Sequence, residues 1–344
     1  MATRPLLWLN IAALAAIAVA AALIVTSNVH SKAPARLLNV SYDPTRELYR
    51  DLNAQFVARR QQSGACIVAI EQSHGGSSRQ ARLSIAGELE PDVVTLGLPS
   101  DVDALRKRGL IAEGWSARLP NLSRPYYSTI VFVVRQGNPQ AIHDWPDLIK
   151  PGIEVITPDP KSSGNGKLTA LAGWGAVVTR GGSDDDARRY LKALYEHTPF
   201  LVVAAREAGV AFAVEKVGDV HVAWENEALR EVTESKGSLQ IVYPPVSILA
   251  EPSVAWVDAN VAKHRSEALA KSYLEYLFSD DAQETIARDG YRPFNAAVLA
   301  RHADTLPPLD LFSVKAVAHD WDDTQSKFFA DNGVIDTVYR PKPR

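Results

Sequence analysis

Apolar and polar positions alternate along this chain with two different periods. Short apolar runs at residues 37–42, 67–71 and 92–96 predict strands, and the amphipathic stretches at 43–60, 79–88 and 101–108 predict helices between them. Strands that alternate with helices at this spacing indicate βαβ units and a parallel sheet. The first part of the chain therefore predicts one α/β lobe.

A second set of strands and helices follows, and the whole chain predicts two α/β lobes. The strands are expected at 130–135, 154–157, 219–224 and 255–257, and the helices at 146–149, 167–179, 184–197, 225–234, 267–278 and 282–288. An acidic triplet at 184–186 is typical of a helix N-terminus. We expect the chain to cross between the lobes near 127–133 and near 244–254.

The N-terminal segment has the pattern of an export signal. Residues 6–25 are apolar except for Asn10, and Arg4 precedes them. This length is also close to the roughly 20 residues that span a bilayer as a helix, so an uncleaved anchor is the alternative. Ala33-Pro34-Ala35 offers a small-x-small cleavage site. We therefore expect residues 1–35 to be a signal peptide or an anchor, and the body to be periplasmic, either released or tethered by residues 6–25.

Composition narrows the class of protein. The 344 residues are 46% hydrophobic with a net charge of −3, which allows a large core and argues against nucleic-acid binding, since that needs a basic face. The single cysteine, Cys66, excludes an intramolecular disulfide and a multi-cysteine metal cluster. Because Cys66 begins the apolar run 66–70, we expect a buried, inert thiol.

Three predicted strand-to-helix turns share one chemistry. Small or capping residues stand before a helix at 43–45, where Asp43 is the expected N-cap, at 75–78 and at 162–166. Free backbone N–H groups at a helix N-terminus, together with the positive end of the helix dipole, bind an anion without a cationic side chain. Such turns lie at the carboxyl ends of strands, where α/β proteins usually bind ligands. A turn of this kind also occurs simply as a helix cap, so the pattern by itself does not identify the anion.

The same turns lack residues that the common nucleotide-binding and catalytic motifs require. A P-loop would need glycine at Lys161 and serine or threonine at Leu168, and a dinucleotide fingerprint would need glycine or alanine at Thr169. His74 and Ser77 invite a Ser–His pair, although Arg79 stands where a nucleophile elbow has glycine. Nucleotide binding is disfavoured, and an ester hydrolase that uses Ser77 or Ser163 remains an alternative.

Several longer motifs resemble the periplasmic sulfate-binding proteins of ABC importers. The resemblance runs from about residue 37 to about residue 336 and is carried by residues 39–49, 72–77, 142–145, 159–164, 223–228 and 291–293. It implies two α/β lobes of the type II kind, each a mixed, mainly parallel sheet flanked by helices and joined by hinge strands. The expected domains are 36–127 for lobe 1, 128–248 for lobe 2, 249–320 for the return to lobe 1, and 321–344 for a C-terminal tail that packs on the lobes.

The same resemblance implies a site made of uncharged donors. Carried onto this chain, the donors are backbone N–H groups, one hydroxyl and one indole N–H, from Asp43, Ser77, Ser163, Gly164, Asn165, Ala205 and Trp224. We expect no catalysis, no cofactor and no metal. The expected ligand is sulfate or thiosulfate, the expected partners are the inner-membrane permease subunits of an importer, and the protein is expected to be a monomer.

Some positions depart from the family pattern. Asp159 replaces asparagine, Asn165 replaces glycine, Lys167 replaces arginine and Glu207 replaces glycine. A donor-only site suits sulfate, which carries no proton at neutral pH, whereas hydrogen phosphate benefits from an acceptor. Phosphate or molybdate is the alternative ligand, and protonated phosphate is favoured if Asp43 or Glu225 turns a carboxylate inward. A membrane-anchored receptor is a further alternative.

Overall fold

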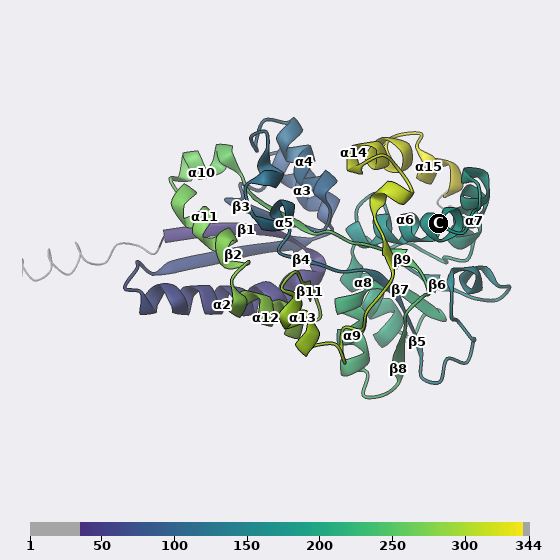
Figure 1. Ribbon diagram of the computed structural model, residues 1–344. Coiled ribbons are helices and arrows are strands. Elements are labelled where there is room, and N and C mark those ends of the chain that lie inside the picture. The colour runs from purple at the N-terminus through teal and green to yellow at the C-terminus, as the bar shows by residue number, and fades with distance from the viewer. Residues whose placement is uncertain (1–34, 340–344) are drawn as a thin grey trace, which may run out of the picture.

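The computed structural model describes residues 35–339, which form two lobes built around two four-stranded sheets (Figure 1). The first sheet has the order β10-β3-β1-β2, with β1 (Ala35–Tyr42), β2 (Val68–Gly75), β3 (Val93–Leu96) and β10 (Ser253–Trp256). β1 is parallel to both β2 and β3, as the βαβ pattern predicts, and β10 is antiparallel to β3.

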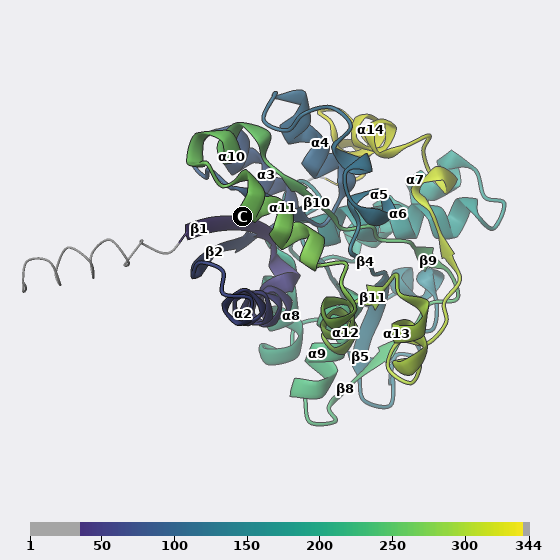
Figure 2. The same cartoon turned by 60° about the vertical axis from the view of Figure 1, so that its left-hand side comes forward.

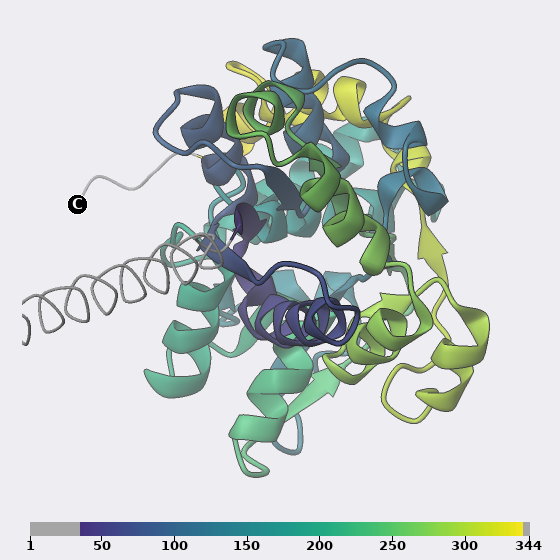
Figure 3. The same cartoon turned by 90° about the vertical axis from the view of Figure 1, so that its left-hand side faces the viewer.

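Helices cover both faces of the first sheet. α2 (Arg46–Gln62) and α11 (Glu267–Tyr276) share one core, and α3 (Ser77–Ile85) and α4 (Pro99–Lys107) share another. Viewed along α2, the sheet separates these two layers (Figure 3). The lobe is completed by η1 (Asp43–Thr45), η2 (Trp115–Ala117), α5 (Pro120–Ser123), α10 (Asp258–His264), α12 (Asp280–Arg288) and α13 (Ala296–Arg301).

The second sheet has the order β6-β7-β5-β8, with β5 (Ile130–Arg135), β6 (Val155–Ile156), β7 (Val220–Trp224) and β8 (Leu239–Val242). β5 is antiparallel to β7 and β8, and β6 is parallel to β7. β6, β7 and β8 therefore run in one direction and β5 runs in the opposite one. Because β5 lies between β7 and β8, two of the three pairings are antiparallel. In each lobe the reversed strand, β5 or β10, follows a passage of the chain from the other lobe.

The helices of the second lobe are arranged around a central helix. α6 (Gly164–Val178) is buried along nearly its whole length and packs against α7 (Asp184–Glu196). Ser183 and Asp186 form a reciprocal cap at the start of α7, so the acidic triplet belongs to a helix N-terminus as predicted. The remaining elements are η3 (Trp145–Ile149), α8 (Ala205–Gly209), the π-helical turn η4 (Val210–Val214) and α9 (Glu225–Glu234).

Paired segments connect the lobes. β4 (Tyr126–Tyr127) pairs with β11 (Arg292–Pro293), and β9 (Ser247–Ile248) pairs with β12 (Leu311–Phe312). Between them, Ser128 and Ala250 exchange two backbone hydrogen bonds of 3.0 and 2.9 Å. The domain boundaries given above remain a prediction.

The C-terminal segment contacts both lobes. It contains η5 (Val314–Ala316), α14 (Trp321–Thr324), η6 (Gln325–Phe329) and α15 (Val334–Val338). α14 approaches α4, and α15 approaches α7 (Figures 1 and 2). The ring of Phe328 lies edge-on to Trp174 of α6, with ring centroids 4.9 Å apart.

Two local predictions are wrong. Cys66 is exposed, because β2 begins only at Val68 and the residues before it lie outside the core. The side chain of Asp43 does not cap its own helix, because it bonds to Arg46 instead. The predicted signal or anchor, residues 6–25, lies outside the described residues. Within residues 35–339, every helix is too short or too polar to cross a membrane.

Candidate functional site

The N-termini of α3 and α6 meet Trp224 between the two lobes. A Cβ atom placed on Gly164, the first residue of α6, would lie 3.3 Å from the Ser77 Cβ and 3.9 Å from Cζ2 of Trp224. A Cβ on Gly76 would lie 2.5 Å from the Ser162 carbonyl oxygen, which is closer than real Cβ contacts allow. Glycine at these positions therefore lets the two backbones approach each other across the cleft.

The N-terminus of α8 joins the same region through Asp43. The backbone N–H of Arg206 donates to Oδ2 of Asp43 at 2.9 Å, and the preceding residue, Ala205, is buried. Asp43 and Ser77 belong to the first lobe. The residues of the second lobe are Ser163, Gly164, Asn165, Ala205 and Trp224. The structure thus gathers all seven predicted residues between the lobes, while their contacts with a ligand stay a prediction.

The first turns of these helices present backbone donors. The first N–H groups of any helix have no partner within that helix, and the helix dipole makes this end positive. Ser163 is the N-cap of α6, is buried, and makes no capping hydrogen bond with its side chain. Its hydroxyl is therefore free to donate to another acceptor.

Trp224 supplies a buried donor of another kind. It ends β7, is 1% exposed, and its ring centroid lies 5.4 Å from that of Tyr42. Its indole Nε1 is buried and makes no hydrogen bond to any residue between 35 and 339. A buried donor without an acceptor is costly, and this one lies beside the first turns of α3 and α6, where a ligand acceptor would satisfy it together with their N–H groups.

The carboxylates of Asp43 and Glu225 are both bonded to arginines. Asp43 accepts from Nε and Nη2 of Arg46 at 3.0 and 2.6 Å. Glu225 forms a two-pronged pair with Arg292 at 2.6 and 2.7 Å, and both side chains are buried. Neither carboxylate is thus turned inward as a free acceptor. The region offers neutral dipoles to an anion rather than a fixed charge.

Ser77 is not paired with a base. Its hydroxyl donates to Oδ2 of Asp101 at 2.6 Å and accepts from the Gly97 N–H at 3.0 Å. His74 makes no bond to it, and burial, followed by the nearby charge of Arg46, lowers the pKa of His74 to about 4. Because the hydroxyl is committed to Asp101, only the backbone N–H of Ser77 is left for a ligand.

Two departures from the family pattern make their own local contacts. The amide Nδ2 of Asn165 donates to the Val222 carbonyl of β7 at 2.9 Å, and its Oδ1 is buried without a hydrogen-bond partner among the described residues. The carboxylate of Glu207 is exposed and accepts from the Val203 N–H at 3.0 Å. The backbone N–H groups of Asn165 and Ala205 are therefore not blocked by the new side chains.

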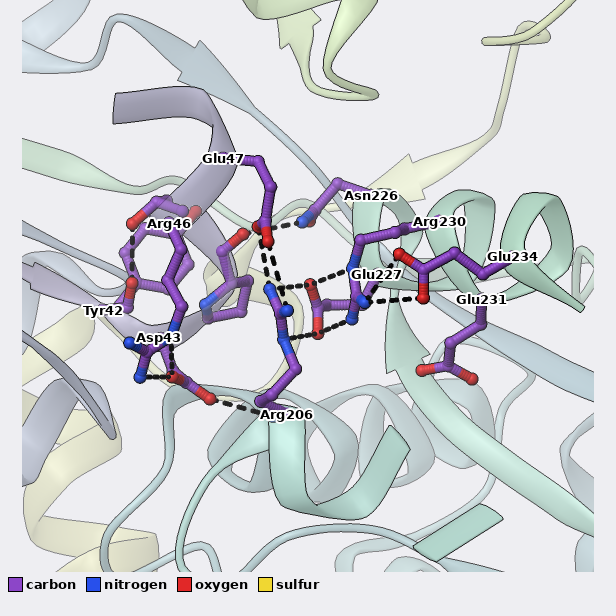
Figure 4. A network of polar contacts seen from close by, with 12 residues as sticks. Tyr42, Asp43, Arg46, Glu47, Arg206, Asn226, Glu227, Arg230, Glu231 and Glu234 are labelled. Atoms are coloured by element: carbon purple, nitrogen blue, oxygen red, sulfur yellow. Dashed lines mark hydrogen bonds and ion pairs between the residues drawn. The ribbon is translucent and has the colours of Figure 1, made fainter. Parts of the chain in front are cut away.

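An ionic network beside the site was not found from the sequence (Figure 4). Arg206 pairs with Glu47 of α2 at 2.8 Å and with Glu227 of α9 at 3.3 Å, and Arg230 pairs with Glu227 at 2.9 Å. Burial raises the pKa of Glu227 against the opposing effect of Arg230 and Arg206. Glu47 and Arg206 lie 159 positions apart in the chain, so no local spacing links them.

A buried pair between Asp101 and Lys167 was missed as well. Asp101 lies on α4 of the first lobe, and Lys167 on the first turn of α6, with Nζ and Oδ1 3.2 Å apart. The only sequence signal was the lysine at a position where the family has arginine. Both networks join side chains of one lobe to side chains of the other.

Comparison with known proteins agrees with this geometry. Residues 37–292 match the family of bacterial extracellular solute-binding proteins. The sulfate-binding protein of Salmonella typhimurium is 48% identical over 305 residues, which cover 88% of this chain and 92% of that protein. The thiosulfate-binding protein of Pseudomonas aeruginosa is 43% identical over 324 residues, which cover 94% and 97%.

A solved structure shows the same two-lobed fold. SubI, the sulfate-binding protein of Mycobacterium tuberculosis, superposes with a TM-score of 0.77 at 30% identity, covering 86% of this chain and 99% of that one. The family match spans most of the chain, and the sequence relatives are similar along nearly their whole length. The chain therefore belongs to the bacterial extracellular solute-binding protein family.

Proposed function

We propose that this protein captures sulfate or thiosulfate between its lobes and delivers the anion to the permease of an ABC importer. The observation that carries the proposal is the buried indole N–H of Trp224, which has no partner among residues 35–339 and lies beside the first turns of α3 and α6. A tetrahedral dianion supplies the acceptors that these donors lack.

The donor set supports sulfate over phosphate. Hydrogen phosphate keeps a proton that needs an acceptor, but the carboxylates of Asp43 and Glu225 are already bonded to arginines. Sulfate brings four acceptor oxygens and no proton, so it matches the backbone N–H, hydroxyl and indole donors. A site that leaves a polar group unpaired discriminates strongly against the wrong ligand. One of the two relatives described above is a sulfate-binding protein and the other a thiosulfate-binding protein, so they support both anions alike.

A side-by-side titration tests the ligand. The purified protein is titrated with sulfate, thiosulfate, phosphate and molybdate at pH 6 and pH 8, with tryptophan fluorescence and calorimetry as readouts. We expect saturable binding of sulfate or thiosulfate with the same affinity at both pH values, because neither anion takes up a proton there. Binding of phosphate without sulfate or thiosulfate would overturn the proposal.

Trp224→Phe tests the observation itself. We expect affinity to fall about 10- to 100-fold, which corresponds to losing one donor to a charged group, and much of the fluorescence response to disappear. Trp174→Phe is the matched control. Trp174 is equally buried and its indole N–H also lacks a partner among residues 35–339, but it lies in the α6 core against Phe328. Full sulfate affinity in Trp224→Phe would show that the indole N–H of Trp224 does not bind the ligand.

Delivery to a permease implies that the folded body works outside the cytoplasm, as the family description states. Export by residues 1–35, with either cleavage or retention as an anchor, is part of the proposal. N-terminal sequencing of the protein recovered from the periplasm distinguishes these two outcomes. Loss of sulfate uptake on deletion of the chain supports the transporter, whereas unchanged uptake supports a receptor.

A further inference from the structure

A tight turn before α6 sets where the predicted donors of this helix lie. The carboxylate of Asp159 accepts from the Lys161 N–H at 2.7 Å, and the Asp159 carbonyl accepts from the Ser163 N–H at 2.9 Å. Asp159 therefore closes the turn partly with its own side chain, which is a common role of aspartate. The turn at 159–163 thus determines the position of the Ser163 hydroxyl and of the first N–H groups of α6.

The same turn is bonded to the segment that precedes α8. The Asp159 N–H donates to the Val202 carbonyl at 2.8 Å, and the Ser162 hydroxyl donates to the Val203 carbonyl at 2.7 Å. Val203 stands two residues before Ala205, the predicted donor of α8. The predicted donors of α6 and α8 therefore share one support, and a shift of the turn would displace both.

The first lobe also contacts this turn. Nη1 of Arg82 on α3 donates to the Lys161 carbonyl at 3.0 Å. A Cβ atom on Gly76, just before α3, would lie 2.5 Å from the Ser162 carbonyl oxygen. The turn therefore lies directly against the start of α3, which carries the predicted donor Ser77.

The side chain of Lys161 leaves the turn and reaches the C-terminal segment. Its Nζ donates to the carbonyls of Phe329 and Ala330 at 3.0 and 3.3 Å and pairs with Asp336 at 2.8 Å. Phe329 ends η6, and lysine commonly bonds to the last carbonyls of a helix. An ammonium group has three N–H donors, and three acceptors surround this one. Lys161 is therefore engaged with the C-terminal segment rather than available to an anion.

The C-terminal segment is itself held by contacts with the second lobe. Nζ of Lys167 on α6 donates to Gln325 at 3.0 Å, and Lys327 pairs with Asp184 of α7 at 2.9 Å. Between these two lysine contacts and the end of η6, Phe328 is fully buried. These contacts give Lys161 a well-anchored partner against which it holds the turn.

We propose that Lys161 is a positioning residue that holds the turn at 159–163 against the end of η6, so that sulfate affinity depends on the C-terminal segment. This role rests on the proposed function, since the turn positions the donors for that anion. Lys161 acts without touching the ligand. A turn released from η6 must be ordered again when sulfate binds, and the entropy lost in ordering it opposes binding.

Lys161→Met tests the proposal. We expect sulfate affinity, measured by calorimetry, to fall about tenfold, roughly the cost of ordering one residue of backbone. In the absence of sulfate, hydrogen exchange of the amides at 162–166 should be faster in this variant than in the wild-type protein, because the turn is released. Lys161→Arg keeps a cation that can bond to the same carbonyls, so it should restore affinity to within about threefold of the wild-type value.

Two further variants separate positioning from general destabilisation. Asp336→Asn removes one of the three acceptors at the protein surface and should give a smaller change of the same kind. Lys327→Met is the matched control, because Lys327 also joins the C-terminal segment to the second lobe, but through α7 and not through the turn. It should leave both the sulfate affinity and the exchange at 162–166 unchanged.

Full sulfate affinity in Lys161→Met, or unchanged exchange at 162–166, would overturn the proposal. A fall in affinity without faster exchange, together with a weaker dependence of affinity on salt, would make Lys161 a charge partner of the anion instead. If Lys161→Met does not fold, the same comparisons are made with Asp336→Asn. The exchange measurement needs no ligand, so it decides whether Lys161 holds the turn even if titration of the wild-type protein contradicts sulfate binding.

Discussion

Ser163 holds its hydroxyl uncommitted at the start of α6, and this makes it the sharpest single-residue test of the predicted site. We expect Ser163→Ala to weaken sulfate binding by about 1–3 kcal/mol, the usual cost of losing a hydrogen bond to a charged group. Calorimetric titration measures the change. Stability should barely move, because the hydroxyl does not cap its helix.

Ser279 provides the matched control. It is also an N-cap serine, but its hydroxyl accepts from the Ala282 N–H at the start of α12. Ser279→Ala should lower the free energy of unfolding by about 0.5–2 kcal/mol and leave affinity unchanged. Equal affinities of the two variants would show that Ser163 does not touch the anion.

His74 predicts a pH dependence of stability. The folded protein takes up this proton only near pH 4, whereas an unfolded histidine takes it up near pH 6.5. Acidification between those values therefore favours the unfolded chain. In His74→Gln the free energy of unfolding, measured with urea, should fall less between pH 7 and pH 5 than in the wild-type protein. The exposed His143→Gln should follow the wild-type curve, and identical curves for all three proteins would contradict the assignment.

At the scale of elements, Asp101 and Lys167 connect three helices. Asp101 of α4 accepts from the hydroxyls of Ser77 and Ser78 on α3 at 2.6 and 2.8 Å, and it pairs with Lys167 of α6. Nζ of Lys167 also donates to Gln325 of the C-terminal segment at 3.0 Å. The pair therefore fixes the first turns of both helices whose N–H groups are the predicted donors.

Lys167→Met should be strongly destabilising. It leaves Asp101 buried without its cation, which costs about 3–5 kcal/mol of unfolding free energy, and it should also weaken sulfate binding because the pair bridges the lobes. Lys167→Arg keeps the charge and should lose less. Lys107→Met, which breaks the exposed pair with Asp322, should cost at most about 1 kcal/mol. If Lys107→Met and Lys167→Met cost the same, the buried pair has no special role.

At the scale of the molecule, the ligand and the lobe–lobe contacts favour the same closed form. Sulfate present at about a thousand times its Kd should stabilise the fold by roughly 4 kcal/mol. If the empty protein opens at its paired connecting segments, sulfate should also reduce the radius of gyration measured by X-ray scattering. Stabilisation without compaction would mean that the lobes are already closed before the anion binds.

Local chemistry explains what was predictable. The strands and helices of the first lobe follow from periodicity, and the turns at Gly76, Ser163 and Gly164 follow from glycine and serine before helices. Asp43 was predicted as a helix cap from the same local rules. This prediction was wrong because the carboxylate of Asp43 accepts hydrogen bonds from Arg46 and from the Arg206 N–H instead. The predicted burial of Cys66 was wrong because an apolar run does not show at which residue its strand begins.

The sequence by itself determined the α/β lobes, the turns that present backbone donors and, through its motifs, the family. The tertiary structure alone decided that β5 lies reversed inside its sheet, that Arg206 meets Glu47, and that Lys167 meets Asp101. Periodicity and capping depend on neighbours within a few positions along the chain. Pairing across the cleft depends instead on how two lobes approach, and no short-range pattern records that approach.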